Sequence, residues 1–194
     1  INAEKTMAQG IRAVLGATKR ELSDKTAIKY ILDPSLNSYY KESLNLATLS
    51  KLGRTLFHPH YTFRKKISHT ADSQNQRHRM TPGSRPILFA HFQSDKPDFI
   101  TPPLIQNNAR ANELYRKTME LVWKNISAII NLGVTPEFAL YALPNAFPIR
   151  FEESGDLLNL HHKWTTRLCY NAQEEICSMC LDEVKQVAQV HQKL

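Results

Sequence analysis

The sequence predicts an α+β fold that is rich in helix and has few strands. Apolar residues recur at helical spacing in several segments, most clearly over residues 111–129, whereas residues 60–68 alternate as in a strand. The chain has 194 residues, which fits one domain able to bury about 70% of its unfolded surface. We therefore expect one compact unit that needs neither disulfides nor a metal to fold.

The first 50 or so residues are predicted to be helical and carry no chemical motif. A helix over residues 3–16 would place four apolar side chains on one face: Met7, Ile11, Val14 and Leu15. A second helix, ended by Gly53, is indicated by Leu44, Leu46, Leu49 and Leu52. The turn signal Asp33-Pro34 lies between them.

A strand is predicted from His60 to Ser68. On one face it has Tyr61, Phe63, Lys65 and Ile67, and on the other Thr62, Arg64, Lys66 and Ser68. The polar block 70–86 follows and should end in a loop, because it contains Pro82-Gly83 and Pro86. The short apolar run 87–89 and a segment interrupted by prolines come next.

The second half is predicted to be mostly helical. The first stripe, which Gly133 should end, is Ala111, Leu114, Tyr115, Thr118, Leu121, Val122, Ile126 and Ile129. Thr135-Pro136 should begin a short helix that Pro144 ends, and residues 147–151 suit a strand.

Two further helices complete the prediction. Gly155-Asp156 should open one that continues through Arg167, and Asn171 with Glu174 should cap the last. The apolar stripe of the last helix is Ile176, Cys177, Cys180, Leu181, Val184 and Val187.

The chain is basic, with 25 Lys plus Arg against 18 Asp plus Glu and a formal charge of +7. From Arg64 to Arg85 there are six Lys or Arg and one acid, Asp72. This excess favours an anionic partner, such as a nucleotide, a nucleic acid or a membrane surface. No apolar run approaches the ~20 residues needed to cross a bilayer, so we expect a soluble protein without a membrane partner.

Cysteine content and the N-terminus favour a cytoplasmic location. Three cysteines clustered late in the sequence make a poor disulfide framework, which suggests a reducing compartment. The N-terminal segment has no uninterrupted apolar region of the kind found in signal peptides. Because the sequence begins with Ile1, we expect a processed or excised piece of a longer chain.

The densest chemical feature is Arg77-His78-Arg79. Two guanidinium groups around an imidazole suit a phosphate or another planar anion. The alternative is a solvated basic turn, because short basic runs are common on protein surfaces.

Other constellations are weaker. His161-His162 with Cys169, Cys177 and Cys180 has the composition of a zinc site. Because Cys177 and Cys180 fall on an apolar stripe, where cysteine behaves as a small hydrophobe, we predict no metal site. Ser84 has no identifiable base to make it a nucleophile. Trp123 and Trp164 are expected in the core.

The strand, the polar block and Arg77-His78-Arg79 together resemble the flavin-dependent thymidylate synthases, whose signature begins Arg-His-Arg. Residues 55–58 resemble the family's Pro-Phe-Glu-His, and residues 61–63 its Phe-Thr-Phe. The C-terminal helical signature is matched by residues 139–144, 155–162, 167–168 and 171–176. The resemblance covers Thr55 to Cys180.

The resemblance implies the family's fold, with a small antiparallel sheet in residues 55–194 and an extra N-terminal helical segment in residues 1–54. It also implies a methyltransferase that converts dUMP to dTMP with methylenetetrahydrofolate, FAD and NADPH as reductant, in a homotetramer. The cofactor-binding residues would be Arg77, His78, Arg79 and His162. The substrate-binding residues would be Gln74, Arg77, Ser84, Arg85 and Arg167. Arg167 would also be catalytic, because a cation at the uracil edge stabilises the charge that develops on the ring.

Six positions differ from the family pattern: Phe57 replaces an acid, Pro82 a serine, Leu140 and Leu158 arginines of the nucleotide and flavin sites, and Asp156 and His162 asparagines. Three hypotheses therefore stay open. The chain is a divergent synthase, or a non-catalytic domain of the same fold that serves assembly or nucleotide binding. The third is a nucleic-acid binder that uses the basic segment 64–85.

Overall fold

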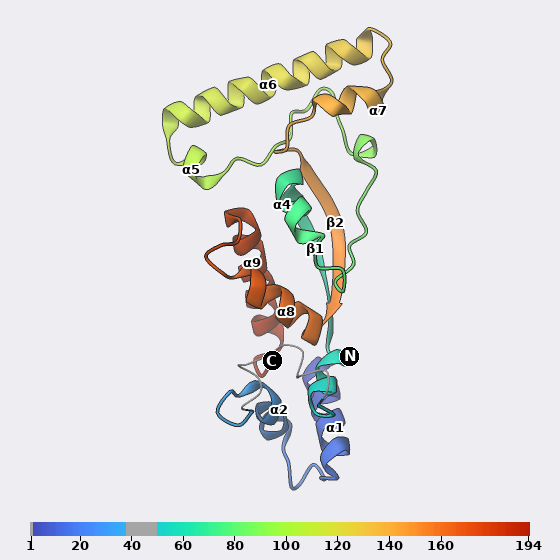
Figure 1. Cartoon of the computed structure of the whole chain (residues 1–194), viewed down its shortest axis with the longest axis vertical. Helices are drawn as coiled ribbons and strands as arrows, with labels where there is room; N and C mark the ends of the chain where they lie inside the picture. Colours follow the sequence, from blue (N-terminus) through green and yellow to red (C-terminus); the bar gives the residue numbers. More distant parts are fainter. Residues whose placement is uncertain (1, 38–49) are drawn as a thin grey trace. The chain divides into compact units, whose positions relative to one another are not determined.

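The computed structural model describes residues 2–37 and 50–194, which divide between two compact units. Unit 1 comprises Ile1–Phe63, His78–Pro82 and Ser154–Leu194; unit 2 comprises Arg64–Arg77 and Gly83–Glu153. Strands β1 (His60–Ser68) and β2 (Pro148–Asp156) form a two-stranded antiparallel sheet (Figure 1). The predicted helix-rich α+β class is confirmed, whereas the predicted boundary at residue 54 stays a prediction.

In unit 1, α1 (Ala3–Leu15) packs against α2 (Asp24–Leu32). Met7 and Ile11 are buried as predicted, but Val14 and Leu15 are exposed because α1 ends there, at a left-handed Gly16. Arg12 fixes the pair of helices: its Nη1 donates to Leu22 O at 3.2 Å and to Asp24 Oδ1 at 2.7 Å.

The helix predicted around Leu44, Leu46 and Leu49 lies outside the described residues. The 3₁₀ helix η2 (Gly53–Phe57) follows.

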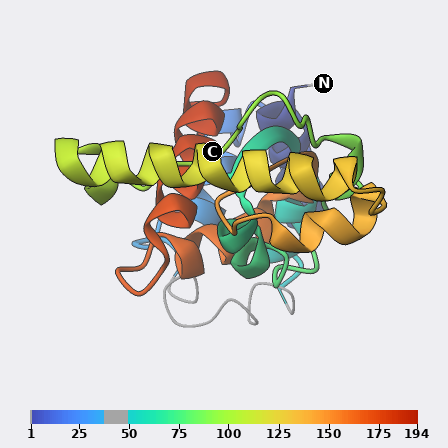
Figure 2. The same ribbon diagram turned by 90° about the horizontal axis from the view of Figure 1, so that it is seen from above.

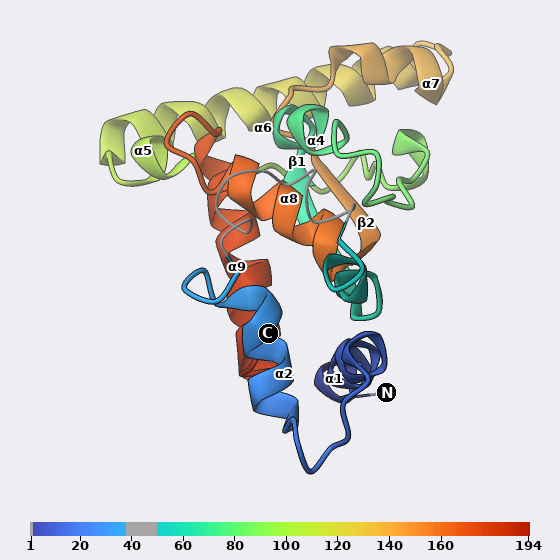
Figure 3. The same cartoon turned by 60° about the horizontal axis from the view of Figure 1, so that its bottom comes forward.

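Two C-terminal helices of unit 1, α8 (Leu157–Arg167) and α9 (Glu174–Val190), contact each other (Figure 3). The predicted start of α8 is confirmed, because Asp156 Oδ1 accepts from Asn159 N at 2.9 Å. The predicted cap of α9 at Asn171 is wrong, since Gln173 Oε1 accepts from Ile176 N at 3.0 Å. The buried face of α9 is Ile176, Cys180, Glu183 and Val187.

Unit 2 begins on β1, where Phe63 of unit 1 is followed by the buried residues Lys65 and Ile67, as the alternation predicts. Helix α4 (His69–Asn75) forms in the polar block, where the sequence analysis expected only a terminal loop. Ser68 explains it as an N-cap, since its Oγ accepts from Ala71 N at 3.1 Å. Unit 2 also holds four short helices: η3 (Leu88–Ala90), α5 (Pro103–Gln106), α7 (Pro136–Ala139) and η4 (Leu140–Ala142).

Helix α6 (Ala109–Asn131) is the longest described element, and α7 lies beside its C-terminal part (Figures 1 and 2). Its buried residues are Met119, Trp123 and Ile126. The predicted stripe is partly wrong, because Leu114 is 67% and Leu121 56% exposed. The helix is therefore buried within unit 2 only at these three residues, of which Trp123 is the largest.

Within the described residues, no helix is both long and apolar enough to cross a membrane.

Candidate functional site

The signature histidine begins a tight turn in unit 1. His78 O accepts from Thr81 N at 3.2 Å and from Thr81 Oγ1 at 3.1 Å. The turn approaches Gly155 closely: a Cβ at that position would lie 2.8 Å from Thr81 Cγ2. Because real side chains do not pack at that distance, only glycine allows this contact. Gly155 therefore helps to place His78 beside the start of α8.

Two of the residues assigned to the cofactor meet in this unit. The rings of His78 and His162 lie edge to face with their centroids 5.9 Å apart. His162 is exposed on α8, and His78 is half-buried. Burial, together with the nearby charge of His162, lowers the pKa of the neighbouring His161. The His78–His162 pair can offer ring edges and an N–H donor to a planar group.

Unit 1 also holds two of the predicted arginines. Arg79 is exposed and forms no ion pair with any described residue. Arg167 is half-buried in the last turn of α8. A cation in the last turn is stabilised by the partial negative charge of the helix C-terminus.

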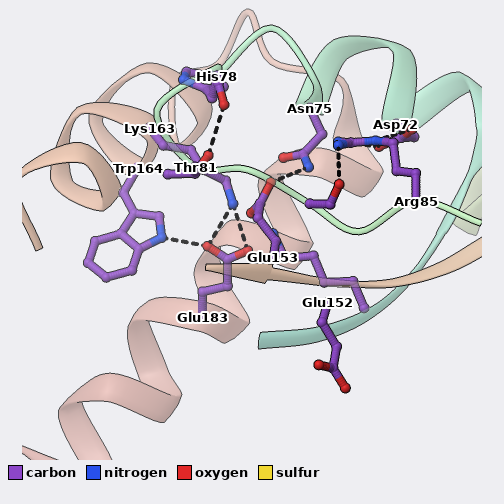
Figure 4. A network of polar contacts seen from close by, with 12 residues as sticks. Asp72, Asn75, His78, Thr81, Arg85, Glu152, Glu153, Lys163, Trp164 and Glu183 are labelled. Carbon is purple, nitrogen blue, oxygen red and sulfur yellow. Dashed lines mark hydrogen bonds and ion pairs between the residues drawn. The ribbon is translucent and has the colours of Figure 1, made fainter. Parts of the chain in front are cut away.

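A buried ion pair, which the sequence analysis missed, joins α8 to α9. Lys163 Nζ donates to Glu183 at 2.9 and 3.1 Å, and Trp164 Nε1 donates to Glu183 Oε2 at 2.7 Å. Figure 4 shows both side chains directed at this carboxylate. Lys163 and Glu183 are almost fully buried. The pair holds fixed the helix that carries His162 and Arg167. The sequence did contain a sign of this ion pair: Glu183 lies seven residues after Ile176 and therefore on the apolar face of α9.

The remaining predicted residues lie in unit 2. Gln74 is half-buried on α4, and its carbonyl accepts from Arg77 N at 3.4 Å. Arg77 is exposed, and no described residue pairs with its charge. Ser84 is exposed, and its hydroxyl donates to Glu152 O at 3.2 Å. A hydroxyl that donates to a backbone carbonyl is not activated by a base.

Arg85 is held by an acid of its own unit. Its Nε donates to both carboxylate oxygens of Asp72, at 2.9 and 2.8 Å, and Nη2 lies 2.8 Å from Asp72 Oδ1 (Figure 4). The guanidinium also stacks 4.7 Å above the ring of Phe151. The charge of Arg85 is therefore already neutralised, which makes this residue a support for the loop as well as a predicted substrate ligand.

Glu153 forms a second buried ion pair in unit 2. It is 0% exposed, pairs with Lys65 of β1 and accepts from Asn75 Nδ2 at 2.7 Å (Figure 4). One carboxylate thus joins β1, β2 and α4. The alternation of residues 60–68 placed Lys65 on the same face as Phe63 and Ile67, but nothing in the sequence identified its partner.

The positions that depart from the family pattern occupy different environments. Leu158 is buried in unit 1, and Phe57 is 42% exposed there. Pro82 O accepts from Ser154 N at 3.0 Å, so the proline extends the pairing along β2. Leu140 lines an apolar cavity of about 470 Å³ in unit 2.

The cysteines lie in three different environments. Cys180 is buried, Cys177 is half-buried and Cys169 is exposed, and all three are free thiols. Within residues 2–37 and 50–194, no group of three or more His, Cys, Asp or Glu is arranged to hold a metal ion.

Comparison with known proteins identifies the family. The sequence model of the family described as thymidylate synthase complementing protein matches residues 2–191. The chain belongs to this family. The resemblance to flavin-dependent thymidylate synthases is thereby confirmed, and it extends beyond the expected Thr55–Cys180 to include α1 and α2.

Curated relatives in this family are named flavin-dependent thymidylate synthase. That of Sulfurisphaera tokodaii is 28% identical over 180 residues, which is 91% of this chain and 63% of the relative. That of Saccharolobus solfataricus is 26% identical over 179 residues, with the same two coverages. That of Sulfolobus acidocaldarius is 28% identical over 170 residues, 86% of this chain and 62% of the relative. The chain therefore spans less than two thirds of these relatives.

Proposed function

We propose that this chain contributes the flavin- and nucleotide-binding region of a divergent flavin-dependent thymidylate synthase. The observation that carries the proposal is the contact between His78 of the Arg-His-Arg signature and His162 of α8, at 5.9 Å between ring centroids. Family membership over residues 2–191 supports it. By this proposal the enzyme methylates dUMP to dTMP.

The donors present suit FAD. Arg77 and Arg79 are exposed without an acidic partner among the described residues, and a guanidinium group binds phosphate through paired N–H donors. The His78–His162 pair offers ring edges to a planar group. We therefore assign Arg77, His78, Arg79 and His162 to FAD. Bound flavin supplies the hydride-transfer chemistry, whereas the protein supplies binding, orientation and electrostatics.

Other side chains are assigned to dUMP. Arg167 would lie beside the uracil, where its fixed charge stabilises negative charge on the ring. Gln74, Arg77 and Ser84 would offer hydrogen bonds to the nucleotide. Arg85 would contribute to the same site with its charge already shared with Asp72, so its contribution is expected to be smaller.

The remaining parts of the proposal follow from the family. They are methylenetetrahydrofolate as the carbon donor, NADPH as the reductant and assembly as a homotetramer. The three free thiols agree with a reducing compartment such as the cytoplasm.

The structure gives less support to the nucleic-acid hypothesis. Of the basic residues in segment 64–85, Lys65 is buried against Glu153, Arg85 is paired with Asp72, and Lys66 donates to Asp98 at 3.0 Å. Two of the six positive charges are thus neutralised within unit 2, and a third, that of Lys66, shares its acid with Arg150. We therefore favour the synthase.

The activity test is formation of dTMP from dUMP with FAD, NADPH and methylenetetrahydrofolate, followed by chromatography. Arg167→Gln should reduce kcat/KM by at least about tenfold, because a charge-assisted contact to the reacting ring is lost. The matched control is Arg20→Gln, an exposed arginine of the same unit. Equal activity of the two variants contradicts the role of Arg167. If the unaltered chain forms no dTMP and binds no flavin, the synthase proposal fails.

A further inference from the structure

Unit 2 contains a polar cavity that no predicted site residue lines. Its volume is about 430 Å³. The lining is Ala90, His91, Gln93, Lys96, Pro97, Asp98, Phe147 and Arg150. A cavity of this size is large enough for a small-molecule ligand.

The segment that carries most of these side chains is firmly anchored to α6. Trp123 Nε1 donates to Gln93 O at 3.1 Å, and Ser127 Oγ donates to Ser94 O at 3.1 Å. The rings of Phe92 and Phe99 pack against Trp123, with centroids 6.1 and 6.4 Å away. Because these contacts hold the backbone of residues 92–99, binding a ligand would not require this segment to become ordered first.

The charges in and beside the cavity do not balance. Asp98 is shared by two cations: Arg150 pairs with its Oδ2, and Lys66 Nζ donates to its Oδ1 at 3.0 Å. Burial opposes ionisation of Asp98, but the hydrogen bonds from Arg150 and Lys66 outweigh it and lower the pKa of this carboxyl. Lys96 has no acidic partner among the described residues. In and beside the cavity, one acidic side chain, Asp98, is thus accompanied by three basic ones, Lys66, Lys96 and Arg150.

Additional donors are free in the same cavity. The side chains of His91 and Gln93 form no hydrogen bond with a described residue. With Lys96 and the remaining N–H groups of Arg150, they give four donor side chains from two segments. The ring of Phe147 and Pro97 add apolar surface to the lining.

We propose that this cavity binds a small phosphomonoester, with the phosphate held by Lys96, Arg150 and His91 and the organic part against Phe147. A dianion matches the two positive charges that Asp98 leaves uncompensated, and guanidinium and ammonium groups are the usual ligands of phosphate. The site lies entirely within unit 2 and shares no residue with the proposed flavin and dUMP sets. The proposal is therefore independent of the proposed function.

The test is isothermal titration of the full chain with glycerol 3-phosphate and with inorganic phosphate, in buffer containing 150 mM chloride. Lys96→Gln should weaken binding of both by about tenfold, since one charge-assisted hydrogen bond is lost. Lys124→Gln, an exposed lysine on α6, is the matched control and should bind as the unaltered chain does. His91→Asn is a second variant that keeps a hydrogen-bond donor at this position and should weaken binding less than Lys96→Gln.

Three results would overturn the proposal. The first is no binding of either phosphate probe in chloride buffer, and the second is equal affinity of the Lys96→Gln and Lys124→Gln variants. The third is that a ten-nucleotide single strand binds more tightly than either phosphate probe and that Lys96→Gln does not change its affinity. That result would assign the anion affinity to exposed arginines elsewhere. Circular dichroism of each variant shows that the fold is retained.

Discussion

The imidazole rings of His78 and His162 lie edge to face, with their centroids 5.9 Å apart. One belongs to the Arg-His-Arg signature and the other to α8, 84 positions later in the sequence. Within unit 1, this contact brings together two residues that the proposed function assigns to the flavin. It also makes the site testable by changes that leave the core intact.

Replacing His162 by alanine should weaken FAD binding by roughly three- to tenfold, because an aromatic edge contact contributes about 0.5–1.5 kcal/mol. His162→Phe, which keeps the ring edge, should lose less. Flavin fluorescence quenching measures the affinity. His60→Ala, an exposed histidine of unit 1, is the control. If the alanine variants of His60 and His162 bind FAD equally well, His162 is not a flavin ligand.

Gly155→Ala should destabilise the protein by about 1–3 kcal/mol, because the new methyl group overlaps the turn that begins at His78. The contact at risk is Thr81 Cγ2, which a Cβ would approach to 2.8 Å. Thr81→Ser removes this methyl group but keeps the hydroxyl that donates to His78 O. The double variant should therefore recover part of the loss in urea unfolding. No recovery would show that the strain arises elsewhere, for example at Leu160, whose Cγ would lie 3.1 Å from the new Cβ.

Lys163→Met should lower the free energy of unfolding by about 3–5 kcal/mol, since it leaves the carboxylate of Glu183 buried without its cation. Adding Glu183→Gln removes that charge while keeping an acceptor for Trp164 Nε1. The double variant should thus be more stable than Lys163→Met alone. Urea unfolding followed by tryptophan fluorescence measures both. Strictly additive losses would contradict the coupling between the two residues.

His161 should make unit 1 less stable in mild acid. Burial, with the charge of His162, holds the folded-state pKa of His161 below its ordinary value of 6.5. As the pH falls through 6.5, the unfolded chain takes up this proton before the folded one, so the free energy of unfolding decreases. His161→Gln should flatten this dependence in urea titrations at pH 7.5, 6 and 5, while His60→Gln should not. A His161→Gln profile identical to that of the unaltered chain would show that His161 is not responsible.

Local signals in the sequence predicted most of the elements. The start of α8 at Asp156, the strand 60–68 and the proline start of α7 depend on neighbouring residues, and the structure has all three. The cap of α9 was misplaced because both Asn171 and Gln173 carry a side-chain oxygen able to accept from a helix N–H group, and in the structure Gln173 does so.

The long-range charge pairs could not be predicted. Asp72 neutralises Arg85, and Glu153 neutralises Lys65, across sequence separations of 13 and 88 residues. A basic segment looks uniformly cationic until the fold supplies the acids that face it. Packing partners could not be predicted either. Leu121 lies on the apolar stripe of α6, but no described residue covers it.

The visible absorption spectrum of the purified chain, titrated with FAD and then with dUMP, tests the central claim most directly. The account predicts stoichiometric binding of FAD, a change in the flavin band when dUMP is added, and loss of FAD binding in Arg79→Gln but not in Arg20→Gln. A folded chain whose spectrum shows no bound flavin at saturating FAD would contradict it.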